Sequence, residues 1–144
     1  MSAFIAGSMA QLIKLILIFV KTRSLRLDAL RTAGGWPSSH SALVSALAFA
    51  VGFTDGFDAP YAMVAVGLGL IVLIDAATLR REVGEHAKLL NRIVSHLNNV
   101  GEEARLEARR LEEKVGHRRR EVVAGVILGA MVAFAVCYHW DFWK

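Results

Sequence analysis

Four long apolar stretches, each with at most one charged residue, divide this chain of 144 residues. They cover about 3–20, 42–57, 59–79 and 122–138. A helix that crosses the hydrocarbon core of a bilayer needs about 20 residues, with a range of about 17–25. A buried core in a soluble protein is the alternative, but four such stretches leave too little polar surface to cover them. We therefore expect an all-α membrane protein with four transmembrane helices, forming one domain over 1–144.

The segment between the third and fourth stretches, about 80–116, alternates acidic and basic residues. Within it, apolar residues recur at helical spacing at Leu89, Leu90, Ile93, Val94 and Leu97. The sequence Asn-Asn-Val-Gly at 98–101 is typical of a break between helices. The pattern predicts a charged arm or hairpin of two amphipathic helices, about 82–97 and 102–115.

The basic residues are distributed unevenly between the connecting segments. Lysine and arginine are frequent in 21–39 and in 80–120, whereas 54–60 has none and carries two aspartates. Basic segments that flank membrane spans stay in the cytoplasm. We therefore expect both basic segments on the cytoplasmic side of an integral membrane protein, the inner membrane if the protein is bacterial, with both termini outside. The net charge of +4 then indicates anionic lipid as the partner, and not nucleic acid.

One polar motif precedes the second apolar stretch. Residues 34–42 read Gly-Gly-Trp-Pro-Ser-Ser-His-Ser-Ala. Pro37 suits the first turn of a helix. The hydroxyl groups of Ser38 and Ser39 can accept hydrogen bonds from the unpaired N–H groups at the start of that helix. Such N–H groups also favour a bound anion. Helix capping alone explains the proline and the serines, but it does not explain His40.

A second motif precedes the fourth apolar stretch, where 116–121 read Gly-His-Arg-Arg-Arg-Glu. On a helix, His117 and Glu121 are i and i+4, so they would share a face and form a hydrogen bond. A carboxylate on one imidazole nitrogen makes the other nitrogen a better base or nucleophile. The arginines at 118–120 are adequately explained as a basic collar at the membrane surface.

Two charged residues lie at least one turn inside predicted spans. Lys14 is more than one turn inside the first, and Asp75 is inside the third, near Arg80 and Arg81. A charge at this depth is costly, so each should have a partner or a function. Asp75 could pair with Lys14 or orient one of the arginines, and Lys14 and Arg80 are candidate ligands of a phosphate.

These stretches together resemble the divergent branch of the type-2 phosphatidic acid phosphatase superfamily, which is related to acid phosphatases and vanadium haloperoxidases. The similarity is carried by GGWPSSHSA at 34–42, DAATLRREVGEHAKLLN at 75–91 and GHRRREVVAGVILG at 116–129. Gln11-Leu12-Ile13-Lys14 also resembles the first helix of that branch.

The resemblance implies a role for each motif. His117 would be the nucleophile, Glu121 the carboxylate that orients it, and His40 the general acid. The phosphate would be held by Ser38, Ser39, Lys14 and Arg80, with Arg31 in place of a missing arginine of the first family motif. Asp75 and Arg81 would support this site. The implied activity is hydrolysis of a lipid phosphate or a polyprenyl (di)phosphate through a phosphohistidine, with no metal and no cofactor.

Two other functions fit the same sequence. The protein could bind anionic lipid head groups without turnover, or it could be an assembly protein whose arm docks a soluble partner. Gly125 and Gly129 form a Gly-x-x-x-Gly pair that permits close helix contact and suggests a homodimer.

Overall fold

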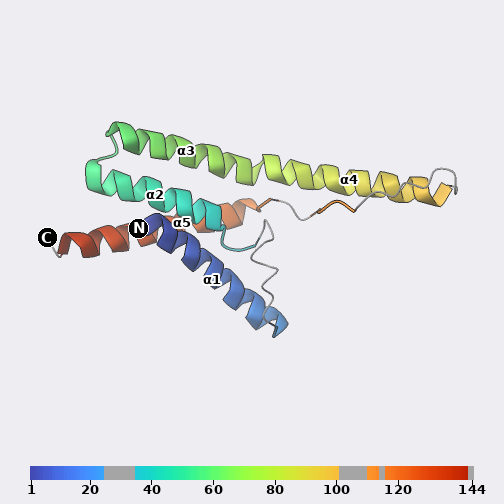
Figure 1. Cartoon of the computed structure of the whole chain (residues 1–144), viewed down its shortest axis with the longest axis horizontal. Helices are drawn as coiled ribbons and strands as arrows, with labels where there is room; N and C mark the ends of the chain where they lie inside the picture. Colours follow the sequence, from blue (N-terminus) through green and yellow to red (C-terminus); the bar gives the residue numbers. More distant parts are fainter. Residues whose placement is uncertain (25–34, 101–109, 114–115, 143–144) are drawn as a thin grey trace.

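The computed structural model describes residues 1–24, 35–100, 110–113 and 116–142. Over these ranges the regular structure is helical, which confirms the all-α part of the predicted fold class. The helices are α1 (Ser2–Thr22), α2 (Ser39–Asp55), α3 (Pro60–Ala77), α4 (Leu79–Val100) and α5 (Arg119–Phe142), and Figure 1 shows their arrangement.

Each predicted apolar stretch corresponds to one helix, with its ends shifted by a few residues. Among the residues that the structure describes, three segments are long and apolar enough to cross a membrane: Ser2–Thr22, Pro60–Asn99 and Arg119–His139. The second of these joins α3 and α4 into one long rod (Figure 1). Helix α2 is apolar as well, but its 17 residues are at the lower limit of a membrane span.

The helices pack through small side chains and expose large apolar ones. The buried core consists of Ala6, Ala10, Ala42, Ala46, Val132 and Ala133. Large aliphatic residues on α3 face outward, for example Val64 at 72% exposure and Ile71 at 68%. Without a hydrophobic force between helices in lipid, close packing of small residues holds a membrane bundle together. Small residues therefore lie inside and large apolar residues outside, the reverse of a soluble protein. This distribution agrees with an outer surface that is buried in lipid.

The backbones of helices α2 and α5 pack closely against each other. A Cβ on Gly125 would lie 2.7 Å from the Cβ of Ser41, and one on Gly129 would lie 2.9 Å from the Cβ of Ser45. The two glycines therefore let the backbones of α5 and α2 meet. The close contact predicted from the Gly-x-x-x-Gly pair is present, and the partner helix belongs to the same chain.

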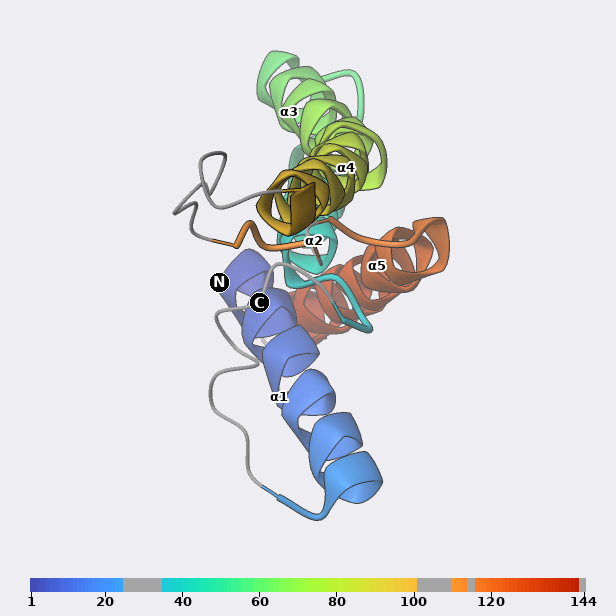
Figure 2. The same ribbon diagram turned by 90° about the vertical axis from the view of Figure 1, so that its right-hand side faces the viewer.

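Three helix ends meet at one end of the bundle. Helices α2 and α5 begin there and α3 ends there, next to the start of α4 (Figure 1). Helix α1 packs across α2 and α5, and its C-terminal half diverges from the bundle, as Figure 2 shows. The segments before α2 and before α5 are thus on the same side of the bundle, as the charge distribution predicts.

The arm differs from its prediction. Helix α4 begins directly after Thr78, the residue that interrupts the rod, and it extends to Val100. Residues 110–113 are not helical, so the predicted second helix over about 102–115 is wrong at those positions, and the rest of it lies outside the described residues. Asn91 on α4 holds this non-helical segment, since its side chain both donates to and accepts from the backbone of Leu111.

Candidate functional site

Two backbone hydrogen bonds tie the converging helix ends together. The N–H of Ser38, before α2, donates to the carbonyl of Glu121 in α5, at 3.0 Å. The N–H of His117 donates to the carbonyl of Ala76 at the end of α3, at 3.2 Å. These bonds bring the two polar motifs, which are nearly eighty residues apart in sequence, to one place.

Ser38 is the N-cap of α2 and is fully buried. Its Oγ accepts hydrogen bonds from the backbone N–H of Ser41, at 3.3 Å, and from the hydroxyl of Ser41, at 2.9 Å. The capping role predicted for the serines is confirmed for Ser38. Pro37 lies before this cap, so its predicted place in the first helical turn is wrong, because Ser38 ends the non-helical segment.

Lys14 is buried although it lies in an apolar helix, with 8% of its surface exposed. Its side chain lies against the backbone of Gly35. A Cβ on that glycine would lie only 2.7 Å from Cε of Lys14. One turn earlier, the Gln11 amide donates to Oγ of Ser39 at 3.3 Å. This contact fixes α1 against the start of α2 and directs Lys14 toward the converging helix ends.

His117 is the buried imidazole of the site, with 6% of its surface exposed. Gly116 positions it: this residue has a φ of 91°, which favours glycine, and a Cβ there would lie 2.7 Å from the backbone nitrogen of Arg81. The Nδ1 atom of His117 is buried and has no hydrogen-bond partner among the described residues. A buried polar atom of this kind is costly unless a ligand or a moving side chain satisfies it.

Glu121 does not form the predicted helical pair with His117. Helix α5 begins at Arg119, so His117 precedes the helix and the i, i+4 geometry does not apply. Instead, Oε2 of Glu121 accepts from the backbone N–H of Arg118 at 3.1 Å, as in the second half of a capping box. The carboxylate nevertheless acts electrostatically on His117 and on Lys14. Lys14, His117 and Glu121 therefore form one cluster.

His40 lies in the first turn of α2 and is exposed to solvent. The backbone hydrogen bond from Ser38 to Glu121 joins the starts of α2 and α5, so the two histidines lie at the same end of the bundle. One ring is therefore accessible and the other is buried.

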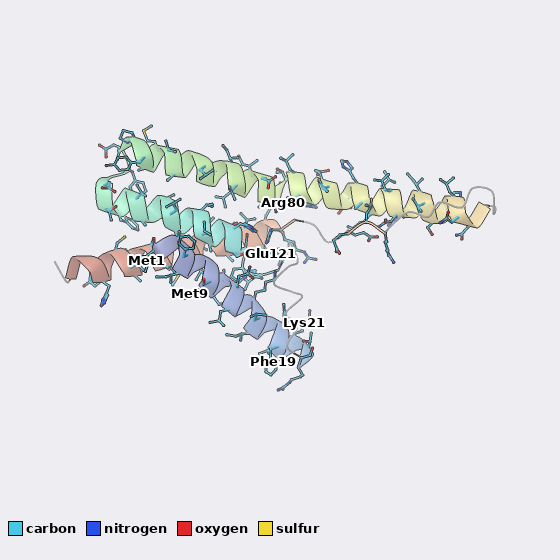
Figure 3. The ribbon with its side chains drawn as sticks, viewed as in Figure 1. Met1, Met9, Phe19, Lys21, Arg80 and Glu121 are labelled. Atoms are coloured by element: carbon cyan, nitrogen blue, oxygen red, sulfur yellow. The ribbon has the colours of Figure 1, made fainter. Side chains whose placement is uncertain are left out.

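Arg80 belongs to the cluster as well. Its Nε donates to Oδ2 of Asp75 at 2.7 Å, which decides between the predicted partners of that aspartate. Figure 3 shows Arg80 and Glu121 beside the junction of α3, α4 and α5. Arg81 is exposed on α4, and Arg31 lies outside the described residues.

An open cleft of about 1050 Å³ borders this cluster. It is lined by Lys14, Ile18, Gly35, Arg81, Glu85, Lys88, Glu112, Glu113, Gly116, His117, Arg118, Arg119, Arg120 and Glu121. The contribution of α4 beyond Arg81 was not predicted from the sequence, although Arg81, Glu85 and Lys88 have the spacing of one helix face. Within the described ranges, no group of three or more His, Cys, Asp and Glu side chains could hold a metal ion.

The electrostatics of the cluster favour a neutral His117. Burial is the main reason that the pKa of this imidazole lies below its usual range, and the Glu121 carboxylate opposes that effect. The charges of His40, Lys14 and Arg80 lower the pKa further. A neutral imidazole keeps a nitrogen lone pair, which is what a nucleophile or a base requires.

We expect His117 to lose its proton below pH 6.5, the usual value. Because the unfolded chain keeps the usual pKa, it binds the proton more tightly, so stability should decrease as the pH falls below about 6.5. Glu121→Gln, which removes the opposing charge, should lower the pKa again. Nitrogen NMR of the histidine rings in detergent measures the titration midpoint of His117 in the wild type and in Glu121→Gln. A wild-type midpoint above the usual value would contradict the electrostatic account.

The comparisons with known proteins identify the family of the chain. Residues 1–132 match the family described as "Divergent PAP2 family". The chain is also 32% identical over 146 aligned positions to the "Uncharacterized membrane protein YuiD" of Bacillus subtilis (strain 168), covering 96% of this chain and 92% of that protein. No solved structure matches the chain. The chain therefore belongs to the divergent PAP2 family of membrane proteins.

Proposed function

We propose that this protein is an integral membrane phosphatase that removes phosphate from a lipid phosphate through a phosphohistidine at His117. The observation that carries the proposal is a buried imidazole with an unpartnered Nδ1, located where a buried lysine and two helix N-termini converge. Membership of a PAP2-related family supports the same chemistry.

The phosphate would be held by fixed positive groups. Lys14 lines the cleft with His117, and the positive ends of the α2 and α5 helix dipoles would attract an anion. The Asp75 carboxylate holds Arg80 in one orientation, from which the guanidinium acts electrostatically on His117. Fixed cations of this kind stabilise the charge that spreads over the phosphoryl oxygens during transfer.

The proposed reaction has two steps. A nitrogen of His117 attacks phosphorus, the bond from phosphorus to the lipid oxygen breaks, and His40 gives its proton to the departing alcohol. His40 then takes a proton from water, whose oxygen attacks the phosphohistidine, so that inorganic phosphate leaves and His117 is restored. The exposed position of His40 suits proton exchange with solvent.

Glu121 would change partners during this cycle. Its Oε2 caps α5 through Arg118, and a carboxylate has a second oxygen that can accept another hydrogen bond. We propose that this carboxylate accepts Nδ1–H of His117 when substrate is bound. That bond would stabilise the positive charge that develops on the imidazole.

The direct test is phosphate release from a short-chain phosphatidate by the purified protein in detergent. The proposal expects turnover in the presence and in the absence of EDTA, since the chemistry is assigned to histidine and fixed cations. Absence of phosphate release from phosphatidate, phosphatidylglycerol phosphate and polyprenyl phosphates alike would reject it.

The site would lie on the cytoplasmic side of a four-span bundle, in which α2 is the fourth span. The proposal rests on the basic segments that flank the converging helix ends and on the acidic turn between α2 and α3. Single cysteines at Thr22 and Ser95 should then be labelled from the cytoplasm, and one at Gly56 from outside. Labelling of Gly56 from the cytoplasm would reverse the orientation.

One observation favours a second function, the binding of anionic lipid head groups without turnover. Glu121 caps α5 and makes no hydrogen bond to His117 among the described residues, so the resting site lacks the bond that would orient a nucleophile. A binder would still retain a lipid phosphate from vesicles without releasing phosphate. Parallel measurement of vesicle binding and phosphate release separates the two functions.

A further inference from the structure

Helix α4 carries an apolar stripe that the rest of the described chain does not cover. The stripe consists of Leu79, Val83, His86, Leu90, Ile93 and Leu97. All six residues are exposed, and the aliphatic ones range from 38% at Leu97 to 62% at Leu79. Residues 110–113 are held by Asn91, beside the stripe. They border a cleft that Leu90 also lines, and Leu90 remains 49% exposed.

The spacing of this stripe is that of a coiled coil. Its members follow one another at alternating intervals of four and three residues. That heptad spacing keeps a seam facing a second helix of the same kind, whereas a helix that merely covers a globular core follows a period of about 3.6. Leu79, His86 and Ile93 occupy one of the two core positions, and Val83, Leu90 and Leu97 occupy the other.

The geometry of the rod selects the partner. Helices α3 and α4 follow one another as one long rod (Figure 1), so α4 extends from the end of an apolar helix and away from the bundle. Two copies in one membrane would therefore present α4 in the same direction and at the same height. The seam has no lysine, arginine, aspartate or glutamate, so identical copies face each other without repulsion between such charges.

We infer that α4 pairs with α4 of a second copy of this chain, as a parallel two-stranded coiled coil along this stripe. A free helix of this length is marginal in water. The membrane offsets part of the cost, because anchoring fixes the orientation of both helices before they meet. This inference does not depend on the phosphatase activity.

Disulfide cross-linking of the full chain in native membranes tests the pairing. Cys137→Ser first removes the single cysteine of the sequence. In that background, L90C and I93C should give covalent dimers on mild oxidation, whereas R92C, exposed on another face of the same helix, should remain monomeric. Equal yields at the three positions, or none at Leu90 and Ile93, would overturn the inference.

A second measurement does not depend on the efficiency of disulfide formation. Leu90→Glu combined with Ile93→Glu should abolish the dimer counted by single-molecule photobleaching in nanodiscs, while Arg92→Glu should leave it intact. A dimer that survives the double substitution would show that another surface holds it. A stripe covered by residues 101–109, by lipid or by a soluble partner would leave the unsubstituted chain monomeric, which also overturns the inference.

Discussion

Replacing His117 with alanine is expected to lower the rate of phosphate release by at least about 10⁴-fold, because the substitution removes the proposed nucleophile. The lipid phosphate should still bind, since Lys14 and the helix N-termini remain. The measurement is kcat on a short-chain phosphatidate, and His96→Ala, an exposed histidine on α4, is the matched control. Equal rates for the wild type and His117→Ala would eliminate the proposed nucleophile.

Chemical rescue separates lost chemistry from lost structure in the same variant. The backbone N–H of His117 holds the end of α3, and alanine keeps that hydrogen bond. The truncated side chain leaves a hole beside the cleft that free imidazole can enter. We expect added imidazole to restore part of the activity of His117→Ala and none of the activity of a variant that has unfolded.

Gly129→Leu is expected to destabilise the bundle by at least about 3 kcal/mol, because the new side chain would collide with the backbone of α2. A Cβ at this position already lies 2.8 Å from the backbone nitrogen of Ala46. A helix backbone cannot yield as a flexible side chain can, so α2 and α5 must separate. Their separation would also dismantle the site that is built at their first turns.

Gly67→Leu is the matched control for this prediction. Gly67 lies in another apolar helix, α3, and a Cβ there would have nothing within 4 Å. We expect a change of less than about 0.5 kcal/mol, as for surface substitutions in general. Thermal unfolding in detergent compares the two variants, and about 2–4 °C is expected per kcal/mol. Equal melting temperatures for both would contradict the assigned contact between α2 and α5.

The apolar helices could be predicted from the sequence because long uncharged stretches have few alternatives to helix in lipid. The end of α2 nearest the site was predictable as well, since Ser38 carries a recognisable cap. The start of α5 was not. Arg118 is an unusual N-cap residue. Its N–H donates to the Glu121 carboxylate, and this hydrogen bond marks the start of the helix.

The convergence of the two histidines was predictable only in outline. Charge distribution placed both motifs on one side of the membrane, but the burial of His117 depends on tertiary contacts. Gly116 packs on the backbone of Arg81, and the N–H of His117 reaches Ala76, two contacts between segments that no local pattern connects. The Asp75–Arg80 ion pair was one of several combinations that the sequence allowed.

The most direct test of the whole account is to trap the intermediate. The purified protein is mixed with a short-chain phosphatidate that carries radiolabelled phosphate, quenched within milliseconds and digested. The account predicts an acid-labile, alkali-stable label on the peptide that contains His117, and its loss in His117→Ala. Turnover without any labelled histidine, or a label on the peptide that contains His40, would contradict it.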